Sequence, residues 1–274
     1  MKPEDLDLVA ATARARAGLA LRGERAFFVE SRLAPLARRE GAISVAGLIE
    51  RLRATADGPL AEAIAQSLST TETSFFRDRA MFDRLRTDIL PALAARRPEG
   101  RLNAWCAGVA TGQEAYSLAM LVEEERGRMG PLQLDIFATD FVSRALEKAQ
   151  SGLYTHFEVQ RGLPIRLLIR HFEKTDDAWR ISTRLRQAIR WRQVNLIVAE
   201  PEVGPFDLIL CRNVLSGLDP EVRPLVLSRL ADALVDDGVL VLGADESAGL
   251  PEAFEPTHGS GVYRRNPGFR RAAA

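Results

Sequence analysis

A short turn at 107–112 joins a strand-like segment to a helical one, and its residue types suit the binding of a nucleotide-like ligand. The turn reads Ala-Gly-Val-Ala-Thr-Gly, and its glycines, Gly108 and Gly112, let the backbone approach a ligand closely. Doubly wound folds bind their ligands at such a first turn. The G-x-x-x-G spacing matches neither the G-x-G-x-x-G dinucleotide pattern nor a P-loop. Taken alone, the turn is equally consistent with a structural bend.

A carboxylate ends the next predicted strand, because QLDIFAT is followed by Asp140. The carboxyl ends of neighbouring parallel strands share one sheet edge, so Asp140 is expected beside the turn. There it can accept two hydrogen bonds from the hydroxyls of a ribose. The alternative is that Asp140 caps the helix that starts near Val142, a role that Asp fills well. The turn and Asp140 together indicate a nucleoside ligand better than either does alone.

The elements that position these residues change character along the chain. Up to about residue 70, apolar residues recur at three- and four-residue spacing, which predicts a small all-α domain over 1–70. Residues 71–100 are expected to form a linker and a helix. From residue 101, strands alternate with helices. This alternation predicts an α/β domain over 101–274, with a mostly parallel sheet covered by helices on both faces.

The alternation is interrupted after residue 152. A helix, PIRLLIRHF, and a candidate strand, AWRIS, lie in a stretch that is too long for one crossover helix. We therefore expect a small inserted β-subdomain at about 155–190. Near the end, EAFEPTH and GVYRRN are expected to pair as an antiparallel hairpin.

Composition excludes several classes of protein. The 37 Lys and Arg residues balance 37 Asp and Glu residues, so no net charge steers the chain toward nucleic acid or an anionic membrane. Cys106 and Cys211 lie in apolar runs, which argues against a disulfide and for a reducing compartment. The acidic start lacks the basic region of a signal peptide, and no apolar run is long enough to span a membrane. We therefore expect a cytoplasmic protein. We also expect no metal site, because the His and Cys residues are scattered along the chain.

Three segments in order resemble one enzyme family. They are STTETSFFRD at 69–78, WCAGVATGQEAYSLAM at 105–120 and FDLILCRNVL at 206–215. Together they are similar to the signature segments of the CheR family, the chemotaxis receptor methyltransferases. The resemblance implies a helical domain followed by a Rossmann-like sheet that binds S-adenosylmethionine (SAM) and carries an inserted β-subdomain. It also implies methyl transfer to glutamate side chains of bacterial chemoreceptors, with S-adenosylhomocysteine (SAH) as the product.

The resemblance also implies where the cofactor binds. Its SAM contacts correspond to Thr71, Thr73, Arg77, Glu114, Asp140, Asn195, Leu196, Arg212 and Asn213. These types include an acceptor for an ammonium group, a donor for a carboxylate and a carboxylate for a ribose. Arg77 is the candidate catalytic residue, because a guanidinium matches a carboxylate bidentately and could orient the acceptor or hold the SAM carboxylate. The alternative is that Arg77 is a structural bridge between the domains.

This sequence departs from the family pattern at three positions. Thr71 stands where the family has Asn, Gln113 where it commonly has Glu, and Gly217 where it has a Tyr near the reactive methyl group. The change at Gly217 leaves two alternatives open. One is a methyltransferase that acts on a different protein carboxylate. The other is a SAM-binding signalling module with reduced turnover.

Three arginines lie close together in the second predicted helix. They are Arg32, Arg38 and Arg39, and the resemblance implies that this basic helix contacts the cytoplasmic domain of the receptor. The alternative is a solvated helix face, since exposed charges usually only contact water. We expect a monomer that neither binds nucleic acid nor inserts into a membrane.

Overall fold

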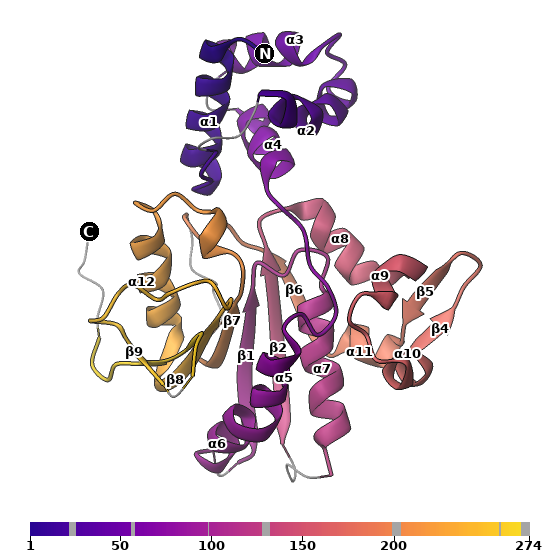
Figure 1. Cartoon of the computed structure of the whole chain (residues 1–274), viewed down its shortest axis with the longest axis vertical. Helices are drawn as coiled ribbons and strands as arrows, with labels where there is room; N and C mark the ends of the chain where they lie inside the picture. The colour runs from indigo at the N-terminus through magenta and orange to yellow at the C-terminus, as the bar shows by residue number, and fades with distance from the viewer. Residues whose placement is uncertain are drawn as a thin grey trace.

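The computed structural model describes residues 1–21, 26–55, 58–97, 99–127, 132–198, 204–257 and 259–269. The chain starts in a helical domain, which lies at the top of Figure 1. The helices are α1 (Pro3–Ala17), α2 (Ala26–Arg39), α3 (Val45–Ala54) and α4 (Pro59–Leu68). Their apolar faces meet in a core that includes the fully buried Leu33, Leu48 and Ile64. None of the helices in the described ranges is long and apolar enough to cross a membrane.

An extended segment leads from α4 down to the sheet domain (Figure 1). It ends in a run of short helical elements: α5 (Arg79–Arg84), the π-helical turn η1 (Leu85–Ile89) and α6 (Leu90–Ala95). Phe75 anchors the segment, because its fully buried ring packs edge-on against Tyr154 at 5.0 Å between ring centroids. Phe76 holds it from a second side by donating its backbone N–H to Ser117 Oγ at 2.9 Å. The linker is therefore fixed on the sheet domain.

The main sheet has the order β6-β2-β1-β7-β8-β10-β9. Its strands are β1 (Arg101–Ala107), β2 (Gln133–Asp140), β6 (Ile189–Gln193), β7 (Phe206–Cys211), β8 (Leu234–Leu242), β9 (Phe254–Pro256) and β10 (Val262–Arg265). The first five strands in the sheet order are parallel, and β10 and β9 form the expected antiparallel hairpin. The topology confirms the predicted α/β class.

Both faces of this sheet are buried, which explains its continuous apolar strands. On β1, Ala104 and Cys106 join the core beneath α7 (Gln113–Glu125). The alternate residues, Trp105 and Ala107, join the core beneath α12 (Arg223–Ala233). Both cysteines of the chain are buried and free, as their apolar surroundings predicted.

The inserted subdomain lies between α8 (Ser143–Ser151) and β6, at the right of Figure 1. It contains the antiparallel sheet β3-β5-β4 and three short helices. These elements are β3 (Leu153–Thr155), α9 (His156–Gln160), α10 (Ile165–His171), β4 (Phe172–Lys174), β5 (Ala178–Ile181) and α11 (Thr183–Gln187). Tyr154 ties the insert to the glycine-containing turn, because its hydroxyl donates to the carbonyl of Thr111 at 2.7 Å.

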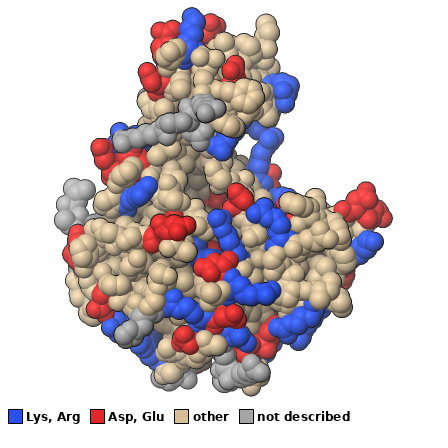
Figure 2. Space-filling model, viewed as in Figure 1, with Lys and Arg blue, Asp and Glu red and all other residues tan. Residues whose placement is uncertain are grey.

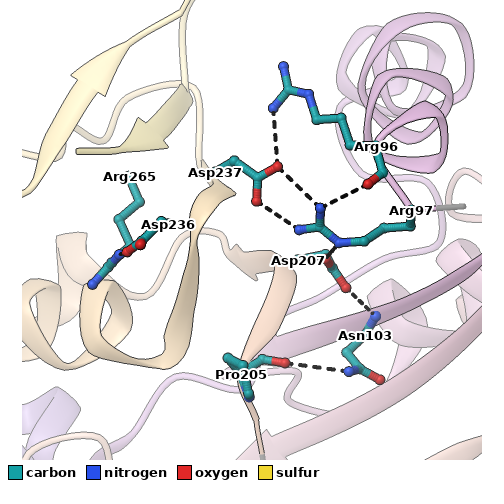
Figure 3. Close-up of polar contacts among 8 residues, drawn as sticks. All are labelled: Arg96, Arg97, Asn103, Pro205, Asp207, Asp236, Asp237 and Arg265. Carbon is teal, nitrogen blue, oxygen red and sulfur yellow. Dashed lines mark hydrogen bonds and ion pairs between the residues drawn. The ribbon is translucent and has the colours of Figure 1, made fainter. Parts of the chain in front are cut away.

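A charged cluster closes the amino end of the parallel strands (Figure 3). Arg97 Nε donates to Asp207 Oδ1 at 2.6 Å, and its two terminal nitrogens donate to the carboxylate of Asp237 at 3.2 and 2.7 Å. The buried Asp207 also accepts the backbone N–H of Asn103 at 2.8 Å. The cluster thus joins the segment after α6 to β1, β7 and β8. We call Arg97, Asn103, Asp207 and Asp237 the amino-edge cluster.

Candidate cofactor site

A cavity of about 260 Å³ lies at the carboxyl ends of the central strands, where the sheet domain meets the helical domain. Figure 2 shows a hollow between these two parts of the molecule. The cavity is lined by the glycine-containing turn, by residues that follow β2, β6 and β7, and by the linker after α4. Of the nine residues that the resemblance implies for SAM, the eight that line it are Thr73, Arg77, Glu114, Asp140, Asn195, Leu196, Arg212 and Asn213.

The turn after β1 forms a tight cradle on the cavity wall. Gly108 has a positive φ of 74°, and a Cβ added there would lie 2.5 Å from Val214 Cγ2. The backbone N–H groups of Gly108 and Val109 donate to the carbonyl of Thr139 at 2.8 and 3.0 Å. The turn is therefore held against the end of β2. Only glycine satisfies both the left-handed conformation and the close approach at this position.

Asp140 is fixed beside this turn by two backbone groups. Its Oδ2 accepts the N–H of Ala110 at 2.7 Å, and its Oδ1 accepts the N–H of Val142 at 2.8 Å. Burial raises the pKa of Asp140, and the backbone donors oppose that rise. An ionised carboxylate has about four acceptor positions, so each oxygen keeps acceptor capacity. Helix α8 starts at Ser143 with Val142 as its N-cap residue, so Asp140 does not cap it.

Glu114 and Arg212 form a buried ion pair on the cavity wall. Arg212 Nη1 donates to Glu114 Oε2 at 2.9 Å, and Arg212 Nη2 donates to the carbonyl of Arg77 at 2.8 Å. Burial raises the pKa of Glu114, although the charge and hydrogen bond of Arg212 act in the opposite direction. Arg212 is only 6% exposed, and its Nε has no hydrogen-bond partner among the described residues. The pair thus keeps unused polar capacity.

Asn195 and Leu196 line the cavity just beyond the end of β6. Asn195 Nδ2 donates to the carbonyl of Arg16 at 2.6 Å, and its Oδ1 accepts the N–H of Ile197 at 3.2 Å. Asn195 therefore connects the sheet domain to the end of α1. Asn213 follows β7 with a positive φ of 59°, and its backbone N–H donates to Glu246 Oε2 at 2.7 Å.

The threonines of the linker face two different spaces. Thr73 and the exposed Arg77 line the cavity, and Arg77 Nη1 donates to the carbonyl of Glu72 at 3.3 Å. Thr71 instead lines a neighbouring groove between α2, α4 and α8. The assignment of Thr71 to the cofactor gains no support from this placement.

Two features of the site were missed by the sequence analysis. Glu246 is buried and its carboxylate accepts the N–H groups of Asn213, Ser216 and Gly243, which fixes the loop after β7. Glu246 lies in the loop that follows β8, and no sequence pattern there indicated that its carboxylate would hold another loop. The segment 17–21 at the end of α1 also lines the cavity, through Ala17, Leu19, Ala20 and Leu21. Only the packing of the two domains reveals that contribution.

The cavity residues fit SAM in chemical type. Glu114 can accept from the α-ammonium group, and Asp140 retains acceptor capacity for ribose hydroxyls. Arg212 and the exposed Arg77 bring two guanidinium groups to the same wall. The Gly108 cradle leaves no room for a side chain where the turn meets the loop after β7. These observations match a zwitterionic nucleoside ligand.

Comparisons with known proteins agree with this interpretation. Residues 71–261 match the family model described as "CheR methyltransferase, SAM binding domain". Chemotaxis protein methyltransferase Cher2 of Pseudomonas putida is 33% identical over 243 residues, which cover 87% of this chain and 88% of the relative. Chemotaxis protein methyltransferase 1 of Pseudomonas aeruginosa is 34% identical with the same coverage. The chemotaxis protein methyltransferase of Escherichia coli is 31% identical and covers 90% of this chain and 86% of its own length.

Proposed function

This chain belongs to the CheR methyltransferase family, and from that premise we propose that it methylates glutamate side chains in the cytoplasmic domain of a chemoreceptor. Membership makes it a SAM-dependent methyltransferase of chemotaxis. The observation that carries the proposal for this site is the buried Glu114–Arg212 pair beside Asp140 in one cavity. These groups provide for both ends of the cofactor.

The chemistry asks little of a general base. SAM supplies an electrophilic methyl group, and a glutamate carboxylate is already ionised near neutral pH. The chain must therefore bind, orient and desolvate the acceptor, so positioning dominates. We assign that role to Arg77. Its exposed side chain lines the cavity, and its backbone carbonyl accepts a hydrogen bond from Arg212, which supports the assignment. Its guanidinium can hold a carboxylate bidentately.

We place the receptor in the groove beside the cavity. The groove lies between α2, α4 and α8, and it shares Arg32 and Ser69 with the cavity. Its charged residues are Arg32, Arg39, Glu62, Arg144 and Glu147. Three arginines against two glutamates favour a helix that carries several acidic side chains.

The same groove divides the arginines of the basic helix. Arg32 and Arg39 are seven residues apart and share the groove face of α2, whereas Arg38 does not line the groove. This arrangement supports receptor docking by α2 through Arg32 and Arg39. The proposal includes a cytoplasmic location, because the receptor domain that it methylates lies there. It also keeps the monomeric state expected from the sequence.

Two experiments test the function in sequence. Calorimetry with SAM and SAH should give saturable binding of both, and radiolabelled SAM should then transfer methyl groups to a receptor cytoplasmic fragment. Absence of SAM binding would overturn the site. Binding without transfer to receptor glutamates would favour the two alternatives raised by Gly217, which are a different protein carboxylate or a signalling module with reduced turnover. Around Gly217, an added Cβ would have no atom of the described residues within 4 Å.

Charge reversal tests the docking face. Arg39→Glu should raise the apparent KM for receptor without changing SAM affinity, and the wild-type interaction should weaken as salt increases. Arg38→Glu provides the comparison on the same helix, because it makes the same change of charge outside the groove. Equal effects of the two reversals would show that the receptor binds a general basic surface on α2 and not the groove. Indifference to both would leave α2 as a solvated face.

A further inference from the structure

The end of α1 crosses from the helical domain to the sheet domain directly at the cofactor cavity. Helix α1 ends at Ala17, and the next residues, Gly18–Leu21, continue along the cavity wall. In Figure 1 the lower end of α1 points at the loop that follows β7. We call Ala17–Leu21 the strap. Its side chains contribute only apolar surface to the cavity, through Ala17, Leu19, Ala20 and Leu21.

Main-chain hydrogen bonds attach the strap to the sheet domain. The N–H of Ala20 donates to the carbonyl of Gly217 at 3.0 Å, and the N–H of Asp219 donates to the carbonyl of Gly18 at 2.7 Å. Leu19 and Leu218 form an isolated antiparallel bridge between these two bonds. The strap thus pairs with the loop after β7 as a two-residue ribbon.

Side chains reinforce this attachment on both flanks. Arg14, one turn before the strap, forms an ion pair with the buried Asp219 at 3.5 Å and a hydrogen bond with Glu221. Asn195, itself a cavity residue, donates to the carbonyl of Arg16 at 2.6 Å. A residue predicted to contact SAM therefore also holds the end of α1.

The strap has a shape that only glycine allows at its first bend. Gly18 caps α1 with φ 68°, and a Cβ added there would lie 2.9 Å from both Ile197 Cγ2 and Val222 Cγ1. The close approach brings the end of α1 against the residues that follow β6 and precede α12. Alanine at this position would be strained by its conformation and would push the strap away.

We propose that the strap is part of the cofactor site, and that SAM binds with full affinity only when the strap is docked on the sheet domain. Its apolar residues line the same cavity as Asn195 and Leu196, and Asn195 is bonded to the residue that precedes the strap. The strap would therefore cover the flat purine of the ligand. The helical domain then serves the cofactor as well as the receptor. This inference rests on the family's use of SAM, and receptor methylation is not needed for it.

Breaking the Arg14 attachment tests the inference without relying on methyl transfer. Arg14→Glu places a carboxylate against Asp219 and Glu221, so the docked fraction of the strap should fall. Apparent affinity falls with the fraction of molecules that are competent to bind, and we expect the calorimetric Kd for SAM and SAH to rise roughly fivefold or more. Amide exchange at Ala20 and Asp219 should accelerate, because both N–H groups donate across the attachment.

Arg53→Glu is the matched control. Arg53 pairs with the buried Asp5 at 2.6 Å inside the helical domain and does not line the cavity. Arg53→Glu makes the same change of charge as Arg14→Glu. It should leave SAM affinity and amide exchange at Ala20 unchanged. A loss of SAM affinity as large as that of Arg14→Glu would show that the effect comes from general damage to the helical domain, and would overturn the inference.

The remaining outcomes are also decisive. Faster exchange with unchanged SAM affinity in Arg14→Glu would show that the strap moves without affecting the cofactor, which overturns the inference. If Arg14→Glu changes neither amide exchange nor SAM affinity, Gly18→Ala is the second variant, because it displaces the strap by strain at the first bend. Faster exchange with unchanged SAM affinity in Gly18→Ala would also overturn the inference. Failure of the wild-type protein to bind SAM would instead contradict the family-based function.

Discussion

The sheet domain carries an arginine with carboxylate partners at each of its two edges, and the two clusters differ in how their hydrogen-bonding groups are used. At the amino edge, Arg97 donates to Asp207 and to both oxygens of Asp237. At the carboxyl edge, Arg212 donates to Glu114 and to a backbone carbonyl and forms an ion pair with Asp78 at 3.6 Å. Its Nε has no hydrogen-bond partner among the described residues. The first cluster uses its hydrogen-bonding capacity internally. The second lines the cavity and leaves one buried N–H of Arg212 without a hydrogen-bond partner among the described residues.

The pKa shifts express the same difference. The hydrogen bond and charge of Arg97 lower the pKa of Asp237, and the hydrogen bonds of Asp237 and Asp207 raise the pKa of Arg97, so this pair favours its ionised form. Burial raises the pKa of Glu114 in spite of Arg212, so the ionised form of that carboxylate is less favoured than in water. In a structural ion pair the charged groups find their partners within the protein, whereas in a binding site some charged groups gain their partners only when a ligand binds. An arginine near a carboxylate is therefore not informative until its remaining partners are counted.

The largest effect is expected from Arg77, next to the carboxyl-edge pair. Arg77→Ala should slow methyl transfer by roughly 10²- to 10³-fold, the range for removing one preorganised donor. Its Tm should change little, because the side chain is exposed. Arg77→Lys should recover little activity, since an ammonium lacks the planar fork. Near-normal turnover with Lys would mean that only a positive charge is required, and unchanged turnover with Ala would leave Arg77 as a structural bridge.

The opposite result is expected at the amino edge. Arg97→Ala leaves the buried Asp207 without its cation and should lower the free energy of unfolding by about 3 kcal/mol. SAM affinity of the folded protein should not change. Arg96→Ala is the control, because Arg96 reaches Asp237 only at 3.8 Å from an exposed position. Denaturant unfolding measures both variants, and equal losses would show that Arg97 does not anchor the cluster.

Two buried aspartates sharpen the same contrast. Asp140→Ala should weaken SAM binding by about 1 to 3 kcal/mol, through the loss of ribose acceptors and of the acceptor for Ala110. Asp207→Ala should lower the free energy of unfolding without weakening SAM binding, because Asp207 lies at the other edge. Calorimetry and denaturant unfolding on both variants decide the point. Unchanged SAM affinity in Asp140→Ala would remove the ribose assignment.

The smallest effect is a pH dependence that separates binding from folding. The pKa of Glu114 lies above its ordinary value of 4.5, and an ammonium partner would lower it, so SAM affinity should fall as pH drops through the raised pKa. The limit is about tenfold per pH unit for one proton. Asp237 has a pKa below its ordinary 3.8, so its stabilisation is complete above 3.8 and is lost as pH falls further.

At pH values between the raised pKa of Glu114 and the lowered pKa of Asp237, the protein should remain folded while SAM affinity declines. Calorimetry across pH, with circular dichroism as the check on folding, measures both quantities. Glu114→Gln should abolish the pH dependence along with most of the affinity. A wild-type affinity that is flat from pH 7 to the onset of acid unfolding would contradict the assignment of Glu114 to the ammonium group.

The sequence by itself determined the local elements and the class of the fold. Apolar periodicity distinguished the helical domain from the α/β domain, because burial on one face or on two leaves different spacings. The motif order determined the family resemblance, and eight of the nine residues implied for SAM do line one cavity. Chain order was sufficient there, since parallel strands bring successive carboxyl ends to a common edge.

Only the tertiary structure decided which distant groups meet. Arg212 pairs with Glu114 98 positions away, and Arg14 reaches Glu221 207 positions away. No local pattern encodes either pairing, because each depends on how the helical domain, the linker and the sheet pack together. The same packing moved Thr71 into the groove and brought the strap to the cavity. Spacing along a chain fixes which face a side chain occupies, whereas its partners are fixed by the surfaces that folding brings against that face.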